Sequence, residues 1–274
     1  MKKGKIILLL LIFVILLSIA STALFIFYNR ETEPKIDQNG NPIFIDFTNQ
    51  VYTNPKEYLG YYVTIKGQVF QNVADNGETK DVQVWIDPVE CDKNVMIRYT
   101  NDVDLKDGDY IICTGYIQEL YKYTNTFGTE ILVPMICSSD VSHSNYIDVV
   151  SPTISSITPE NLTYENKNCS ITIDKIEFAE NETRLYLTAQ NNSNTTLYID
   201  TDSSVIIQNQ KQYNIQYNYQ ADYAEIPYDL KAGTTMSGIV VFPSIEDLEF
   251  DYLLEIYLDT YEGWSKDVIL HIIK

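Results

Sequence analysis

An uninterrupted apolar run near the start of the chain constrains its fold and location most. Residues 6–28 contain no charged side chain, and three lysines lie within the five residues before them. A helix of this length spans about 35 Å, because each residue adds ~1.5 Å, and the hydrocarbon core of a bilayer is about 30 Å thick. We therefore predict a transmembrane helix at residues 6–28, after a basic cytoplasmic start at residues 1–5.

A cleaved secretory signal peptide is the alternative interpretation of this run. Its cleavage site would be Ser21-Thr22-Ala23, but apolar residues continue from Leu24 to Tyr28. A signal peptide ends its apolar region at the cleavage site, so the sequence favours an uncleaved anchor. The positive-inside rule then leaves the lysines in the cytoplasm. We expect a single-pass protein of the cell membrane whose chain beyond about Arg30 is extracytoplasmic.

The charge of the remaining chain limits its partners. The formal net charge is −19; residues 43–142 carry 15 acidic and 7 basic side chains, and residues 150–274 carry 19 and 7. Such a surface repels polyanions, so nucleic acid, anionic lipid head groups and anionic wall polymers are disfavoured. The alternative is that the charge serves only to keep an exported protein in solution.

A small barrel is predicted after a polar tether at residues 29–42. In Tyr62–Phe70, apolar and polar side chains alternate with the period of two that is typical of a half-buried strand. Five short strands, two of them containing glycines, predict a closed all-β barrel at residues 43–141. The five predicted strands are Tyr62–Phe70, Asp81–Asp87, Asn94–Thr100, Tyr110–Tyr121 and Glu130–Cys137.

An antiparallel β-sandwich is predicted for the second domain, residues 164–274. A segment rich in Ser, Asn, Thr and Pro precedes it, so we expect a mobile linker at residues 142–163. Beyond it the sequence has strand character and turns but no convincing amphipathic helix. The predicted strands are Cys169–Ala179, Arg184–Gln190, Ser204–Gln208, Thr234–Phe242, Tyr252–Leu258 and Asp267–Ile273.

The barrel segment resembles a known family. The resemblance rests on Asn54-Pro55 with Tyr58-Leu59-Gly60, on VTIKGQV at residues 63–69, and on Gly108-Asp109-Tyr110-Ile111 with Gly115-Tyr116-Ile117. These motifs are similar to those of the tRNA-anticodon-binding-like OB-fold family of exported bacterial proteins. The resemblance implies an OB-type five-stranded barrel. It implies no tRNA binding, because this chain lacks the basic stripe that nucleic acid requires.

The second domain also resembles a known family. The motifs are ITIDKI at residues 171–176, Leu185 with Asn191-Asn192, LKAGT at residues 230–234 and GIVVFP at residues 238–243. They are similar to an immunoglobulin-like extracellular family of unknown function that is related to mycobacterial immunoprotective antigens. The resemblance implies an immunoglobulin-like sandwich, and it supplies no catalytic or ligand residues.

The sequence offers little catalytic chemistry. His143 and His271 lie too far apart in the chain to predict a metal site or an acid/base pair. The acidic run from Asp102 to Asp109 has Lys106 at a position where a calcium loop needs a ligand, which favours a charged turn. Of the four cysteines, only Cys91 and Cys137 are candidates for a disulfide. We therefore expect no cofactor, no metal and no enzymatic activity.

Aromatic side chains are the remaining candidates for a binding site. Rings that stand outward on a sheet can stack on sugars or pack against a protein partner. Tyrosine is also an ordinary strand residue, so most of the 22 tyrosines need no function. The candidate ligand-binding residues in the barrel are Trp85, Tyr99, Tyr116, Tyr121 and Tyr123. A second tyrosine-rich group in the sandwich comprises Tyr213, Tyr217, Tyr219, Tyr223 and Tyr228.

Two main functional hypotheses follow. The first is a non-enzymatic interaction module of the cell envelope, bound to an envelope protein or glycan and held at the membrane by residues 6–28. The alternative is a receptor-like domain that binds a neutral oligosaccharide or another small ligand through outward aromatic residues. An enzyme is the third possibility, which the missing polar clusters disfavour.

Overall fold

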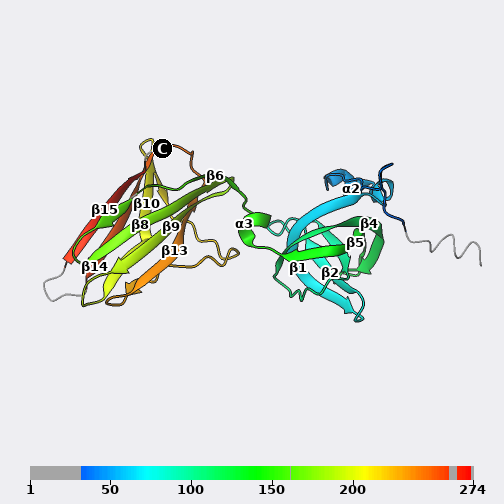
Figure 1. Ribbon diagram of the computed structural model, residues 1–274, viewed down its shortest axis with the longest axis horizontal. Coiled ribbons are helices and arrows are strands. Elements are labelled where there is room, and N and C mark those ends of the chain that lie inside the picture. The colour runs from blue at the N-terminus through cyan, green and yellow to red at the C-terminus, as the bar shows by residue number, and fades with distance from the viewer. Residues whose placement is uncertain (1–31, 161, 259–263, 273–274) are drawn as a thin grey trace, which may run out of the picture. The chain divides into compact units, whose positions relative to one another are not determined.

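The computed structural model describes residues 32–160, 162–258 and 264–272 (Figure 1). The predicted basic start and anchor, residues 1–28, lie outside these residues. Within the described part, no helix is long and apolar enough to cross a membrane. The chain divides into two compact units, one ending at His143 and the other beginning at Ser144. Both units are built of β-strands, which confirms the all-β prediction.

The first unit is a closed five-stranded barrel with the strand order β1-β2-β3-β5-β4. Strand β3 pairs with β5 in parallel, and the other pairs are antiparallel. Two short helices, α2 (Asn49–Thr53) and η1 (Pro55–Tyr58), precede it. The strands are β1 (Tyr62–Asp75), β2 (Lys80–Trp85), β3 (Asn94–Tyr99), β4 (Tyr110–Thr124) and β5 (Glu130–His143).

The barrel closes around alternating apolar residues. Val63, Ile65 and Val69 of β1 are buried in its core, as the period of two predicts. Two glycines let neighbouring strands approach: a Cβ at Gly67 would lie 2.3 Å from the carbonyl oxygen of Trp85, and one at Gly115 would lie 2.4 Å from that of Cys137. Any larger residue at these positions would therefore displace the adjoining strand.

The second unit contains two β-sheets. One has the order β13-β9-β8-β6 with β7 beside β8; the other has the order β11-β10-β14-β15 with β12 beside β10. A short helix, α3 (Tyr146–Val149), precedes them. The strands are β6 (Thr153–Ile157), β7 (Thr163–Glu165), β8 (Cys169–Ala179), β9 (Glu182–Asn191), β10 (Leu197–Gln208), β11 (Lys211–Asn214), β12 (Asp229–Leu230), β13 (Thr235–Pro243), β14 (Phe250–Leu258) and β15 (Trp264–Ile272).

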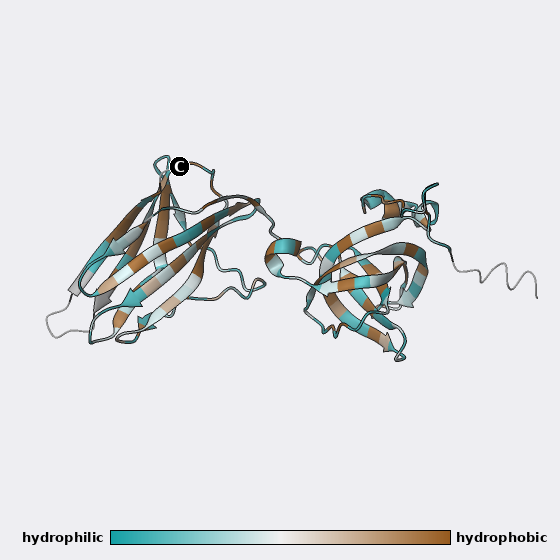
Figure 2. Cartoon of the chain, in the orientation of Figure 1, coloured by the Kyte–Doolittle hydropathy of each residue, from teal (hydrophilic) through white to brown (hydrophobic). Residues whose placement is uncertain are grey.

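One apolar core joins these two sheets into a sandwich. Ile173 and Leu185 contribute from one sheet and Ile206 and Leu254 from the other. Along the strands of both units, apolar residues alternate with polar ones (Figure 2). This alternation is the pattern expected when one face of each sheet packs on a core and the other meets water.

The structure differs from the sequence prediction at the expected linker, residues 142–163. Strand β5 continues to His143, and β6 pairs with β8 from Thr153 opposite Ala179 to Ile157 opposite Ile176. Much of this segment therefore belongs to regular structure. The four cysteines, all within the described residues, are free thiols. Cys91 and Cys137 accordingly form no disulfide in this structure.

Candidate functional site

Three of the five predicted barrel residues lie apart from one another. Trp85 is half-buried and stacks on Phe70, with ring centroids 4.1 Å apart. Tyr116 is half-buried beside Tyr62 at 5.8 Å. Tyr99 does not stand outward as predicted: it is 1% exposed and belongs to the barrel core. Its place in the strand explains this, because it alternates in phase with the buried Val95 and Ile97.

The other two predicted residues, Tyr121 and Tyr123, do meet. Their rings stack with centroids 6.2 Å apart, and they pack against a small apolar cluster that contains Met96 and Met135. A depression of about 430 Å³ on the barrel is lined by other residues, Phe44 to Phe47 and Thr64. The five predicted residues therefore do not share one ligand site.

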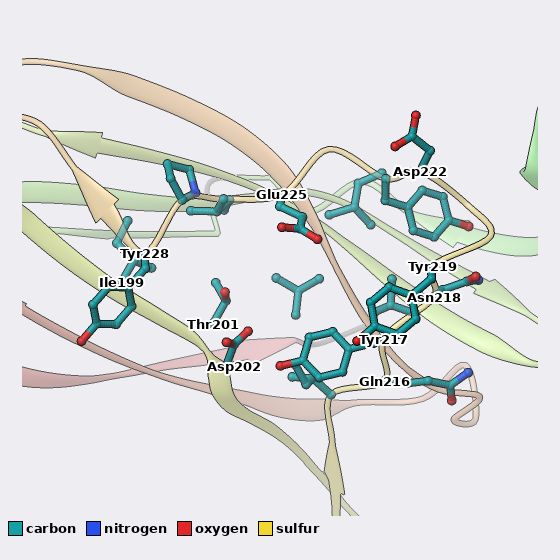
Figure 3. A pocket seen from close by; sticks show the side chains of 17 residues that line it. Ile199, Thr201, Asp202, Gln216, Tyr217, Asn218, Tyr219, Asp222, Glu225 and Tyr228 are labelled. Carbon is teal, nitrogen blue, oxygen red and sulfur yellow. The ribbon is translucent and has the colours of Figure 1, made fainter.

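A more developed site lies in the second unit. An open groove of about 410 Å³ is bounded by β10, β13 and the segment of residues 215–228 that connects β11 to β12. We call it the tyrosine groove. Its volume falls in the range of about 300–1,000 Å³ that is usual for small-molecule sites. Side chains that line it include Ile199, Thr201, Asp202, Tyr217, Tyr219, Glu225 and Tyr228 (Figure 3).

Backbone hydrogen bonds hold the segment 215–228 against the edge of β13. The N–H of Gln216 donates to the carbonyl of Val241 at 2.8 Å, and the N–H of Ile239 donates to that of Ala224 at 2.7 Å. Gly238 makes this approach possible, since a Cβ there would lie 2.7 Å from the backbone nitrogen of Ile226. One glycine in β13 thus positions one wall of the groove.

The variant Gly238→Ala tests this arrangement. The added methyl group must displace backbone, so we expect a loss of about 1–2 kcal/mol in the free energy of unfolding. We also expect faster proteolytic cleavage within residues 215–228, because their hydrogen bonds to β13 would lengthen. The control is Thr235→Ala, an exposed position on the same strand. Equal cleavage rates for Gly238→Ala and the unmodified chain would contradict the assignment.

Three tyrosines of the groove are more accessible than those of the barrel, whereas Tyr223, which also lines it, is half-buried. Tyr217 is 56% exposed and Tyr219 is 89% exposed, and their rings stack at 5.9 Å with only 10° between the ring planes. Tyr228 is 53% exposed and packs beside Tyr198 at 5.4 Å. A ligand can therefore reach aromatic faces here without displacing core residues.

Carboxylates stand among these rings. Figure 3 shows the carboxylates of Asp202 and Glu225 directed into the groove, whereas that of Asp222 points away from it. Partial desolvation raises the pKa of Tyr217, and the neighbouring charge of Asp202 raises it further. The hydroxyl of Tyr217 is therefore protonated and uncharged at neutral pH.

A buried ion-pair network lies beneath the segment 215–228. The guanidinium of Arg184, which is 0% exposed, donates to Glu182 at 2.6 Å and to Glu177 at 2.9 Å. Glu182 is itself 2% exposed and accepts hydrogen bonds from Tyr223 at 2.6 Å and from Asn218 at 2.9 Å. The groove segment is thus fastened to β9 through two of its own side chains.

The network also includes Ser151, which precedes β6, and Thr153, the first residue of β6. Arg184 donates to the Ser151 carbonyl at 2.9 Å and to the Thr153 hydroxyl at 2.8 Å. Burial alone would lower the pKa of Arg184, but its hydrogen bonds to Glu182 and Tyr223 outweigh that effect and raise it. Burial would likewise raise the pKa of Glu177, yet hydrogen bonds from Lys175, Tyr186 and Arg184 hold it below its ordinary value. These groups therefore remain charged at neutral pH.

The sequence indicates the tyrosines of this groove but not its other parts. Asp202 lies in a polar stretch of β10 and Glu225 in an irregular segment, and no local pattern indicates that the fold brings them together. Arg184 is a single charge at the start of a predicted strand. Within the described residues, no group of three or more His, Cys, Asp or Glu side chains is placed to hold a metal ion.

Comparisons with known proteins assign no function to the groove. No family model matches the chain, and no curated protein matches it. A functionally unknown protein from Listeria monocytogenes is 13% identical, with a TM-score of 0.36; the match covers 45% of this chain and 87% of that one. A conserved domain protein from Bacillus anthracis is 8% identical, with a TM-score of 0.30 and 76% of each chain covered.

Proposed function

We propose that this chain is a non-enzymatic binding protein of the cell envelope, and that the tyrosine groove is its ligand site. The observation that carries the proposal is the stacked, exposed pair of Tyr217 and Tyr219 over a groove of about 410 Å³. Exposed aromatic faces gain free energy when a ligand covers them, and a concave wall adds contact area. A small organic ligand is therefore favoured over a flat protein surface.

We propose the envelope location from the apolar run at residues 6–28 and the lysines before it. We also propose that the chain does not bind nucleic acid, because residues 43–142 carry a net charge of −8. The groove holds carboxylates and hydroxyls but contains no histidine or cysteine among the described residues that line it. This composition supports binding in preference to catalysis.

For the folds, we propose that the barrel is of the OB type and that the sandwich is immunoglobulin-like. The barrel order β1-β2-β3-β5-β4, with β3 parallel to β5, supports the first assignment. Two antiparallel sheets around one core support the second. Membership of the exported OB-fold family and of the antigen-related family is likewise a proposal, carried by the motifs quoted above.

A ligand screen tests the proposed site. The full-length chain, in a polyoxyethylene detergent that carries neither sugar nor ammonium groups, is screened by saturation-transfer NMR against small organic molecules and neutral oligosaccharides. We expect binding that is reduced at least about tenfold in the double variant Tyr217→Ala/Tyr219→Ala, because each stacked ring contributes about 1 kcal/mol.

The chain supplies its own control for this screen. Tyr121 and Tyr123 form the comparable stacked pair on the barrel, with centroids 6.2 Å apart. The variant Tyr121→Ala/Tyr123→Ala should retain the binding. If it loses the ligand while the groove variant keeps it, the site lies on the barrel, as the sequence candidates indicated. If neither pair affects any ligand, the proposed groove function is wrong.

A further inference from the structure

We propose that the tyrosine groove selects a cationic ligand, a small molecule bearing an ammonium group. This inference rests on the proposed function and names the ligand class of the same site. It replaces the neutral oligosaccharide of the sequence-based alternative with a positively charged ligand.

The charged side chains that line the groove are negative. Asp202 and Glu225 direct their carboxylates into it, and the described lining residues include no lysine, arginine or histidine. Arg184, whose partner Glu182 contacts the segment through Tyr223, is already matched by Glu182 and Glu177. The groove therefore presents unbalanced negative charge, and a cation that enters gains Coulomb energy that a neutral ligand does not.

The aromatic rings of the groove also favour a cation. The faces of aromatic rings are electron-rich and attract ammonium groups that lie within about 6 Å of the ring centroid. Tyr217 and Tyr219 expose such faces beside the carboxylates of Asp202 and Glu225 (Figure 3). Rings together with carboxylates are the combination that recognises an organic cation. The rings pack against its methyl or methylene groups, and the carboxylates neutralise its positive charge.

The environment of Asp202 favours the same ligand class. None of the described residues that line the groove carries a positive charge that could pair with it. The carboxylate of Asp202 is therefore not matched by a cation of the groove. A neutral sugar could donate hydroxyl hydrogen bonds here but would supply no positive charge to pair with Asp202. An anionic ligand would be repelled.

Choline and its neutral isostere provide the test. The isostere replaces the quaternary nitrogen by carbon, so the two molecules have the same shape and differ by one charge. Both are titrated into the full-length chain in a polyoxyethylene detergent, and binding is measured by saturation-transfer NMR. We expect choline to bind at least about tenfold more tightly than the isostere, and this preference to shrink as salt is added.

Charge-removing variants locate the effect. Asp202→Asn and Glu225→Gln keep the shape of the groove and should each weaken choline binding about fivefold while leaving the isostere unchanged. The matched control is Glu255→Gln, which removes one charge at an exposed position of β14 outside the groove lining and should have no effect. Thermal melting of each variant confirms that its fold is intact.

The outcomes separate this inference from the proposed function. If choline and the isostere bind equally, and both depend on Tyr217 and Tyr219, the groove is a ligand site but the cationic preference is wrong. The same holds if the two carboxylate variants leave choline binding unchanged. If choline does not bind while neutral molecules bind through the tyrosine pair, only the present inference fails. If nothing depends on that pair, both fail.

Discussion

Replacing Arg184 by methionine is expected to lower the free energy of unfolding of the second unit by about 3–5 kcal/mol, the usual loss when one partner of a buried ion pair is removed. Glu182 would be left 2% exposed without the guanidinium that lies 2.6 Å away. The hydrogen bonds from Arg184 to Ser151 and Thr153 would be lost as well. Methionine keeps much of the side-chain volume, so the loss reports on charge and hydrogen bonding.

Chemical denaturation measures this loss, and the chain has one tryptophan in each unit, Trp85 and Trp264. In a Trp85→Phe background the fluorescence comes from the second unit alone. The control is Lys175→Met, which removes another cation paired with Glu177 but from a side chain that is 42% exposed. We expect it to cost about 1 kcal/mol or less, because the lysine end of this pair is exposed to water even though Glu177 is buried. A similar small loss for Arg184→Met would show that the network is not stabilising.

Replacing Gly67 by alanine is expected to destabilise the barrel by about 3 kcal/mol. The new Cβ would lie 2.3 Å from the carbonyl oxygen of Trp85 and 2.6 Å from a methyl carbon of Val84. Real Cβ atoms do not approach backbone so closely, so β2 must move away from β1. Because the barrel is closed, that movement is passed to every other strand pair. Denaturation followed by Trp85 fluorescence, in a Trp264→Phe background, measures the loss.

Gly77→Asn separates this steric effect from the loss of a glycine as such. Gly77 lies in the turn after β1 with a φ of +85°, and nothing lies within 4 Å of the position that a Cβ would take there. Asparagine tolerates positive φ better than other residues with a Cβ, so the cost should remain below about 1 kcal/mol. Equal losses at Gly67 and Gly77 would mean that strand approach in the barrel does not depend on Gly67.

The strands with regular alternation could be predicted from the sequence, and the irregular ones could not. Val63, Ile65 and Val69 mark β1 by themselves. Strand β6 falls within the predicted linker because its short sequence TISSI lies between prolines and carries few apolar residues. It becomes a strand only because β8 offers it hydrogen-bonding partners. Tertiary pairing, which no local pattern contains, decides such a case.

The candidate site shows the same limit more sharply. The alternation in β3 could have excluded Tyr99, since it shares the phase of Val95 and Ile97. Nothing local, however, indicates that Asp202 of β10 meets Tyr217 and Glu225 of the segment 215–228. Those residues come together because the segment lies along the edge of the sandwich. The position of residues from separate segments is set by the fold and by the buried ion-pair network that holds the segment 215–228 to β9.

The hydrogen bonds that hold the segment 215–228 to β13 have a consequence for self-association. Strand β13 is the last strand of its sheet, and its outer backbone groups would otherwise be free to pair with another chain. The bonds from Gln216 to Val241 and from Ile239 to Ala224 occupy part of that edge. The segment 215–228 therefore also protects the sheet against strand addition by another chain. A variant that displaces this segment would expose an aggregation-prone edge of β13.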